Sequence, residues 1–205
     1  MPTLAELAAQ STTLSNPVVD HLLRLTASWS LLSDLAFSDL LLMTKVNDEL
    51  GGDDVRFVVL GQMRPNNRST MINDDLVGTT HRPDAWPLVA LAYESGTRIV
   101  GEVNVEAIDD VVPVWCVPVR FNGHVVAVMV RLQGPLRGPA SLYEQAYLSI
   151  FERLCVMVAD STFPFREDGV AGPGLPRVGD GIILIDGDGR VEFATPNATN
   201  ALHRM

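Results

Sequence analysis

The amino-acid sequence predicts an α+β fold in which helices flank an antiparallel sheet. Three observations lead to this prediction: a tight Asn122-Gly123 turn between two apolar runs, amphipathic patterns of helical period near both ends, and several short apolar runs bounded by turn residues. Of the 205 residues, 47% are hydrophobic and 20% are charged, so the chain can fill a core and is not disordered. The length fits one large domain, or one domain and part of another.

The charge of the chain excludes some functional classes. Fifteen basic and 25 acidic residues give a net charge of −10, and a nucleic-acid-binding protein would usually carry a basic face. The first basic residue is Arg24, so no signal peptide is expected. The longest strongly apolar stretch, 125–130, is too short for a membrane helix. We therefore expect a cytoplasmic protein that binds neither nucleic acid nor membrane.

Helical patterns open the chain. Thr3 and Glu6 have the spacing of a capping box and predict a short helix. A longer helix is expected to begin at Asn16-Pro17, because proline suits the first helical turn. Apolar side chains recur along it at alternating spacings of four and three, at Val18, Leu22, Leu25, Trp29 and Leu32. This pattern fits either the seam of a homodimer or a single wide stripe that faces the core.

Strands and a polar region follow. Residues 40–46 and 55–63 are expected to form two strands, and 70–72 a short third strand in an otherwise irregular region. A helix should begin at Asp84 as its cap and end near Glu94, because Gly96 occupies the position of a C-terminal glycine.

The Asn-Gly turn joins two predicted strands, 112–121 and 124–132. Pro113 and Pro118 cannot donate backbone hydrogen bonds, so the first strand should be bulged or lie partly at an edge.

A long helix is expected over 141–160. Its apolar side chains form one stripe that includes Tyr147 and Leu154 and a second that includes Phe151 and Cys155. Together with the first long helix, this excess of apolar surface suggests a parallel homodimer through the long helices.

A linker and a second module complete the sequence. Residues 163–180 are rich in proline and glycine, which is typical of a linker. Beyond it, 181–186 and 191–194 are expected to pair as strands around an Asp-Gly turn. The last residues continue a helical pattern, so we expect the sequence to be part of a longer protein.

Two segments resemble known sensory modules. Residues 118–129 resemble the last hairpin of GAF domains, with Ala127 where that family often has glycine. Residues 181–198 resemble the opening of a PAS domain, in which two strands precede a helix that contains asparagine. The whole chain is similar to the sensor region of actinobacterial cytosolic two-component histidine kinases.

The resemblance implies a domain organisation and a function. It implies a GAF-like sensory domain with flanking helices at 1–162, a linker at 163–180, and the N-terminal fragment of a PAS domain at 181–205. The parent protein would autophosphorylate a histidine and pass the phosphate to a response regulator. The fragment itself is expected to be non-catalytic, since it has no ATP-binding motifs and no such region follows His21. The same modules also occur with other outputs, such as phosphatases, cyclases or transcription regulators.

The resemblance further implies a ligand pocket between the GAF sheet and its covering loop and helix. Trp86, Tyr93, Trp115 and Cys116 are the candidates to line it, although core packing explains each equally well. A GAF-type redox enzyme is the alternative, and it would need a reactive thiol from Cys116 or Cys155. Neither a cofactor nor a signal is identified, and the acidic residues near His81 match no defined metal site.

Overall fold

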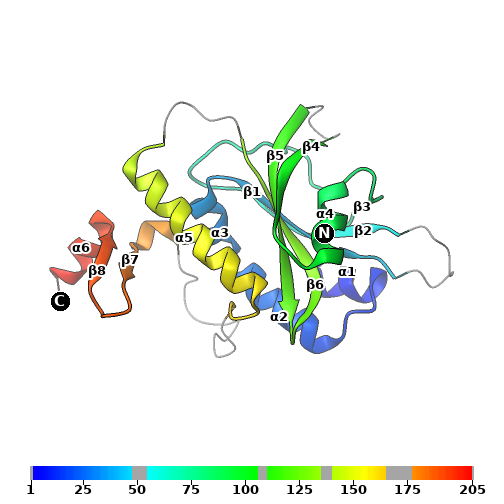
Figure 1. The fold of residues 1–205 in the computed structure, drawn as a ribbon, viewed down its shortest axis with the longest axis horizontal. Helices are drawn as coiled ribbons and strands as arrows, with labels where there is room; N and C mark the ends of the chain where they lie inside the picture. Colours follow the sequence, from blue (N-terminus) through cyan, green and yellow to red (C-terminus); the bar gives the residue numbers. More distant parts are fainter. Residues whose placement is uncertain (1, 48–54, 106–109, 135–139, 165–176, 205) are drawn as a thin grey trace.

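The computed structural model describes residues 2–47, 55–105, 110–134, 140–164 and 177–204. A sheet with helices on both faces forms the larger part, and a hairpin with a short helix lies beside it toward the C-terminus (Figure 1). The helices of the larger part are α1 (Leu4–Ser11), α2 (Asn16–Ala27), α3 (Trp29–Ala36), α4 (Pro87–Ser95) and α5 (Leu142–Ala159). Its strands are β1 (Asp39–Lys45), β2 (Phe57–Met63), β3 (Thr80–His81), β4 (Ile99–Val105), β5 (Asp110–Phe121) and β6 (His124–Leu132). The smaller part contains η1 (Val178–Asp180), β7 (Ile183–Ile185), β8 (Val191–Ala194) and α6 (Pro196–Leu202).

The main sheet is antiparallel throughout, with the strand order β3-β2-β1-β6-β5-β4. Its central strands are β1 and β6, and β6 forms a hairpin with β5, as the Asn-Gly turn predicted. Asn122 and Gly123 have φ values of 49° and 83°, and two successive left-handed residues are what a two-residue hairpin turn requires. The edges of the sheet are β3 and β4.

The two prolines of β5 lie at positions where the absence of a backbone N–H group removes few hydrogen bonds between strands. The carbonyl of Pro113 accepts a hydrogen bond from the backbone N–H of Gln133, just after β6 ends, so its nitrogen faces the end of that ladder. Pro118 lies beyond the pairing with β4, which begins opposite Cys116. A register shift between Val119 and Arg120 is the bulge that the prolines predicted.

Alternating side chains give the sheet two different faces. One, the helical face, packs against α1, α2, α3 and α5, and its core includes Leu42, Val117 and Met129. The other, the α4 face, packs against α4 and the segment 64–79, and its core includes Val114 and Val130. Figure 1 shows α5 and α4 on opposite sides of the sheet.

The predicted long N-terminal helix is wrong in one respect, because it breaks at Ser28 into α2 and α3. The N–H of Ser28 bonds to the carbonyls of Leu25 and Thr26, which closes the end of α2 with tighter turns. The apolar stripe of this region is at most 9% exposed and belongs to the core of this single chain. Of the two interpretations, the structure therefore shows a wide stripe that faces the core.

The region between β2 and β5 differs from the prediction at four places. Residues 70–72 are not a strand, because Thr70 and Met71 donate hydrogen bonds to the carboxylate of Asp39 instead of joining a ladder. α4 begins at Pro87 rather than Asp84, since a residue before proline avoids helical geometry and Trp86 has φ −132° and ψ 62°. Strands β3 and β4 had not been predicted.

The C-terminal elements follow their predicted bounds closely. α5 opens with a capping box of Ser141 and Glu144, and it buries Phe151 and Cys155 on the helical face. β7 and β8 pair around the Asp-Gly turn and precede α6. Most of the predicted linker, 165–176, lies outside the described residues, but Phe163 at its start is 7% exposed and packs in the core.

Candidate functional site

A cavity of about 540 Å³ lies on the α4 face, between the two edges of the sheet. β3 contributes His81, and β4 contributes residues 102–105. Because both edge strands line the same cavity, the sheet curls so that its edges approach each other. The start of α4 and the segments before it complete the wall with Leu76, Asp84, Ala85, Trp86 and Pro87.

The hydrogen-bond pattern of the sheet determines what β4 presents to this cavity. The backbone groups of Pro113 point toward β6, so those of Val112 and Val114 point toward β4. Their partners on β4 are Val103 and Gly101. The alternate residues of β4, Glu102 and Asn104, therefore turn their N–H and C=O groups outward at the open edge.

Residues 64–79 cover the α4 face and are called the covering segment; side chains of β2 and of the residue after it hold this segment in place. Gln62 accepts a hydrogen bond from the N–H of Leu76 (2.9 Å) and donates to the carbonyl of Asp74 (3.2 Å). Arg64 donates to three successive carbonyls, those of residues 72–74, at 2.9–3.1 Å. These bonds satisfy backbone groups that no ladder pairs, and they bring Leu76 to the cavity.

Two buried aspartates fix the same segment to α3 and β1. Asp39 is 0% exposed and accepts from the hydroxyl of Thr70 (2.6 Å) and from the N–H of Met71. Asp34 is 7% exposed and accepts from the N–H of Asn66 (2.6 Å). Buried carboxylates require such donors, so each aspartate makes the position of the covering segment specific.

An aromatic pair, His81 and Trp86, lines the cavity. Trp86 is 4% exposed, and its ring meets His81 edge-on with 6.1 Å between centroids. The Nε2 atom of His81 is 2.8 Å from the hydroxyl of Thr79, which fixes the imidazole. Asp84 lies at the solvent side. The cavity thus combines an apolar and aromatic interior with polar groups at its rim.

The structure does not bring all four predicted site residues together. Trp86 lines the cavity. Tyr93 and Cys116 lie on the same face but are not among the described lining residues. Burial raises the pKa of Tyr93, against the opposing effect of a hydrogen bond with Thr44. Trp115 lies on the helical face.

Sequence reasoning missed the contribution of β4. The signal was present as alternating apolar residues at Ile99, Val103 and Val105, but Gly101 interrupts it. His81 had been considered only as a metal ligand. Among the described parts of the chain, no group of three or more histidine, cysteine or acidic side chains is arranged to hold a metal ion.

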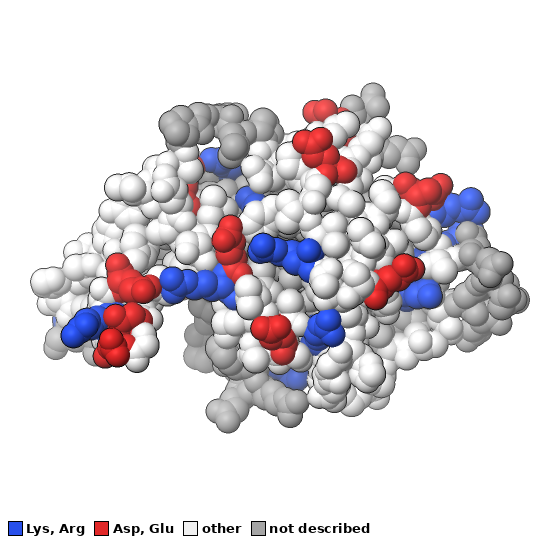
Figure 2. Space-filling model, viewed as in Figure 1, with Lys and Arg blue, Asp and Glu red and all other residues white. Residues whose placement is uncertain are grey.

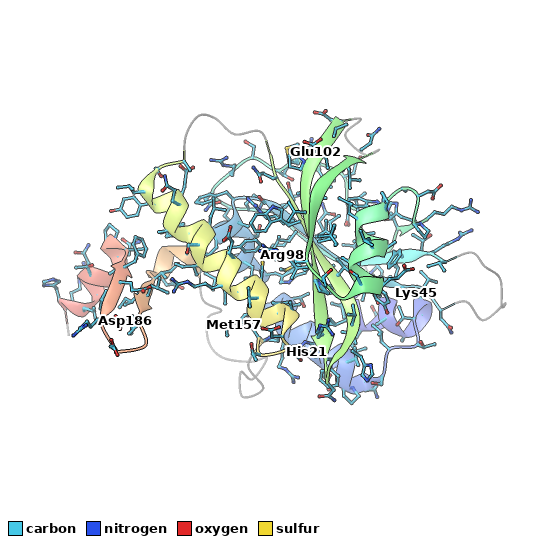
Figure 3. All side chains as sticks on the ribbon, in the orientation of Figure 1. His21, Lys45, Arg98, Glu102, Met157 and Asp186 are labelled. Carbon is cyan, nitrogen blue, oxygen red and sulfur yellow. The ribbon has the colours of Figure 1, made fainter. Side chains whose placement is uncertain are left out.

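On the helical face, Trp115 packs against two arginines, of which Arg131 is buried and Arg98 is exposed. The guanidinium of Arg131 lies 4.8 Å from its ring centroid and that of Arg98 lies 5.1 Å away. Arg131 is 5% exposed and donates to the hydroxyl of Ser38 (3.0 Å) and to the carbonyl of Ala36 (3.1 Å), at the end of α3. Burial lowers its pKa to about 10. Figure 3 shows Arg98 between α5 and the sheet.

Neither cysteine has the properties of a reactive thiol. Cys116 and Cys155 are at most 1% exposed, and burial raises the pKa of each to about 12. A nucleophilic or redox-sensing cysteine needs an accessible thiolate near neutral pH. The two side chains act as small apolar groups on opposite faces of the sheet.

A continuous series of contacts joins the covering segment to the C-terminal part. Arg68 forms an ion pair with Glu144 at the start of α5 (2.8 Å) and lies 5.5 Å from the ring centroid of Phe37. Phe37 stacks on Tyr147 with 6.0 Å between centroids. Tyr147 in turn meets Phe193 of β8 edge-on at 6.4 Å. The stripe of α5 that was predicted as a dimer seam is thus partly covered by β8 of the same chain.

The visible surface carries charges of both signs. Figure 2 shows Lys and Arg interspersed with Asp and Glu on the face that bears α5. No described helix is both long and apolar enough to cross a membrane.

Comparisons with known proteins agree with this geometry. The family model described as the GAF domain of histidine kinase PdtaS matches residues 4–150. The sensor histidine kinases PdtaS of Mycolicibacterium smegmatis and Mycobacterium tuberculosis are each 38% identical to this chain over its full length, and the chain spans 41% of each relative. A solved structure described as the sensor region of a sensor histidine kinase matches 99% of this chain and 69% of its own, with 36% identity and a TM-score of 0.81. The chain therefore belongs to the GAF domain family of PdtaS-type sensor histidine kinases.

Proposed function

We propose that this chain is the sensory input region of a two-component histidine kinase in the cytoplasm. In this proposal it regulates autophosphorylation of a histidine elsewhere in the protein and phosphate transfer to a response regulator. The observation that carries the proposal is the 38% identity to PdtaS sensor kinases over the whole chain. His21 is 4% exposed and packs on Phe121 at 5.3 Å, which suits a core residue better than a phosphate acceptor.

The proposed organisation keeps the three predicted segments: a GAF-like domain at 1–162, a linker at 163–180 and the start of a PAS domain at 181–205. Support comes from the β7–β8 hairpin, whose Ile185 and Val191 are 56% and 59% exposed. A two-stranded hairpin with apolar side chains on its surface is not stable alone in water. Further strands of a PAS domain would cover these side chains.

The cavity between the sheet edges is the proposed input site, and the contacts through Arg68 and Tyr147 are the proposed path to the output. A ligand in the cavity contacts Leu76 of the covering segment. Arg68 of that segment contacts α5, and α5 contacts β8 through Tyr147 and Phe193. A path of packed groups of this kind carries coupling only if it changes an equilibrium, so it must be tested by its effect on activity.

We also propose a homodimer through α5. Leu142, Tyr143 and Val156 remain 82%, 51% and 54% exposed on this helix. Light scattering of the longer protein would test this proposal, and a strict monomer at high concentration would contradict it.

The test of the main proposal measures autophosphorylation of the longer protein that contains this chain. Radiolabelled ATP should place phosphate outside residues 1–205. Tyr147→Ala should change the rate roughly two- to thirty-fold, the range expected when a coupling contact is lost. Arg153→Gln is the matched control, because it breaks an exposed ion pair between the same two elements, Arg153 with Glu192 at 3.3 Å, and should leave the rate unchanged.

Two results would contradict the proposal. Label recovered on a histidine of this chain would make it a phosphate acceptor. The absence of any phosphorylation would favour another output, such as a phosphatase, a cyclase or a transcription regulator. A redox enzyme is the remaining alternative, and the buried thiols with pKa near 12 count against it.

A further inference from the structure

The inference concerns the chemical class of ligand that the cavity accepts, and it rests on the proposal that this cavity is the input site. Three features of the cavity bear on the ligand: the open edge of β4, the apolar interior, and the charges at the rim. Each selects a different property.

The open edge selects a ligand with neighbouring donor and acceptor groups. Glu102 and Asn104 present N–H and C=O groups that β5 does not pair, at the spacing of alternate strand residues. Among the described residues, no hydrogen bond occupies the outward groups of either one. A ligand with an amide-like edge, one donor beside one acceptor, can pair with them as a strand would.

The apolar interior favours a ligand with a small planar ring system. Side chains of Leu76, Val103 and Val105 are at most 8% exposed and lie with Trp86 around the cavity. A volume of about 540 Å³ is typical of sites for small molecules. Rings that pack against an indole gain both apolar burial and aromatic contact.

The rim selects against negative charge. Asp84 lies at the mouth, and no arginine or lysine is among the described residues that line the cavity. Side chains alternate along β4, and that of Val103 lies on the α4 face. The carboxylate of Glu102 is therefore directed to the other face of the sheet, beside Pro113 of β5. The positive end of α4 also borders the cavity, but Asp84 precedes the first residue of that helix by three positions and offsets it.

We propose that the cavity binds a small planar heteroaromatic or aryl amide of neutral or positive charge, which pairs with the outward backbone groups of β4 and packs on Trp86. Ligands whose binding depends on a phosphate or carboxylate are excluded from this site by the same features.

The test uses the 205-residue chain and three probes with the same ring system. All three keep the primary amide: 2-naphthamide is neutral, 6-(aminomethyl)-2-naphthamide is a cation, and 6-carbamoyl-2-naphthoate is an anion. Binding is measured by NMR, with the backbone amides of Glu102 and Asn104 and the indole N–H of Trp86 as reporters. The neutral and the cationic amide should shift these three signals, and the carboxylate should bind roughly tenfold more weakly or worse because of Asp84.

Charge reversal at the rim sharpens the test. Asp84→Arg should weaken binding of the cationic amide and strengthen binding of the carboxylate, each by roughly tenfold. Asp84 is exposed, so the variant should fold normally. Glu94→Arg is the matched control, because it makes the same charge change at an exposed position in the last turn of α4. It should alter neither affinity.

Several outcomes would overturn the inference. They are equal or tighter binding of the carboxylate by the unaltered chain, shifts that leave Glu102 and Asn104 unaffected, equal responses of Asp84→Arg and Glu94→Arg, or no binding of any probe. None of these outcomes depends on phosphorylation. Failure here therefore refutes the ligand class, whereas failure of the kinase experiment refutes the proposed function.

Discussion

The two faces of the main sheet are built from the same strands but covered in different ways. Four helices cover the helical face, and the large side chains there, such as Trp29 and Phe151, are at most 1% exposed. One short helix and the segment 64–79 cover the α4 face and leave a cavity between the sheet edges. Regular elements can bury a whole face, whereas an irregular cover depends on individual hydrogen bonds and leaves space for a ligand. Most of the large buried side chains thus lie on the helical face, and the proposed ligand site lies on the α4 face.

The largest expected effect is on the helical face. Phe151→Ala should reduce the free energy of unfolding by about 4 kcal/mol, because it removes a fully buried ring from a packed core. Val156→Ala in the same helix should change it by less than about 0.5 kcal/mol, since Val156 is 54% exposed. Urea denaturation measures both. Similar values for the two variants would show that α5 is not docked on the sheet.

A smaller effect is expected where the covering segment is attached. Asp39→Asn should cost about 2 kcal/mol, because an amide cannot accept from both Thr70 and Met71 as well as a carboxylate does. Hydrogen exchange at the amide of Met71 should accelerate more than exchange in β6. The exposed Asp74→Asn is the control and should leave both quantities unchanged. Uniform acceleration of hydrogen exchange throughout the sheet would mean that Asp39 stabilises the whole fold rather than the covering segment alone.

Cys116 lies on the α4 face and Cys155 on the helical face, so measurements on the two thiols allow the faces to be compared directly. Burial raises the pKa of each from 9.0 to about 12, so the unfolded chain loses its thiol protons at lower pH than the folded one. Their contribution to stability is complete below pH 9 and is lost as the pH rises toward 12. Each should account for about 1 kcal/mol of the loss between pH 9 and pH 10.

Denaturation of the unaltered chain and of Cys116→Ala and Cys155→Ala, at pH 8, 9 and 10, measures this slope. Each variant should show a shallower fall with pH than the unaltered chain. An Ellman titration of the native protein at pH 8 should detect neither thiol. Rapid reaction of Cys116 alone would show that the α4 face opens readily.

The smallest effect is expected at the contact between the covering segment and α5. The pKa of Glu144 lies below its ordinary value chiefly because the backbone N–H of Ser141 donates to its carboxylate, with Arg68 contributing less. Arg68→Gln should therefore raise this pKa only slightly and leave it below 4.5, as followed by NMR titration. Stability should fall less than for Asp39→Asn, and the difference should shrink at high salt. A pKa at or above 4.5 would show that Arg68, not the helix cap, stabilises the charge.

Prediction from sequence succeeded where neighbours along the chain determine the structure. The Asn122-Gly123 turn and the capping spacing of Thr3 with Glu6 depend only on local geometry, and both are confirmed. Gly96 also ends α4 in the left-handed conformation that its position indicated. The α+β class and the antiparallel sheet followed from these local patterns.

Prediction failed where residues distant in the sequence determine the local structure. Thr70 has no local reason to leave a strand, since its partner Asp39 is 31 residues away. Trp115 appeared suitable for the pocket, but the period of the strand directs it to the other face, between two arginines. The cavity itself arises because the sheet curls and its edges approach each other, and no short pattern in the sequence records that curvature.

The curled sheet has a consequence for how copies of the protein behave in a crowded solution. An edge strand with unpaired backbone groups is usually a template on which another chain can add a strand and start aggregation. Here the outward groups of β4 face a cavity closed on its other side by β3 and by the start of α4. An incoming strand would have to displace those elements first. The geometry that leaves room for a small ligand is therefore also a barrier to uncontrolled self-assembly.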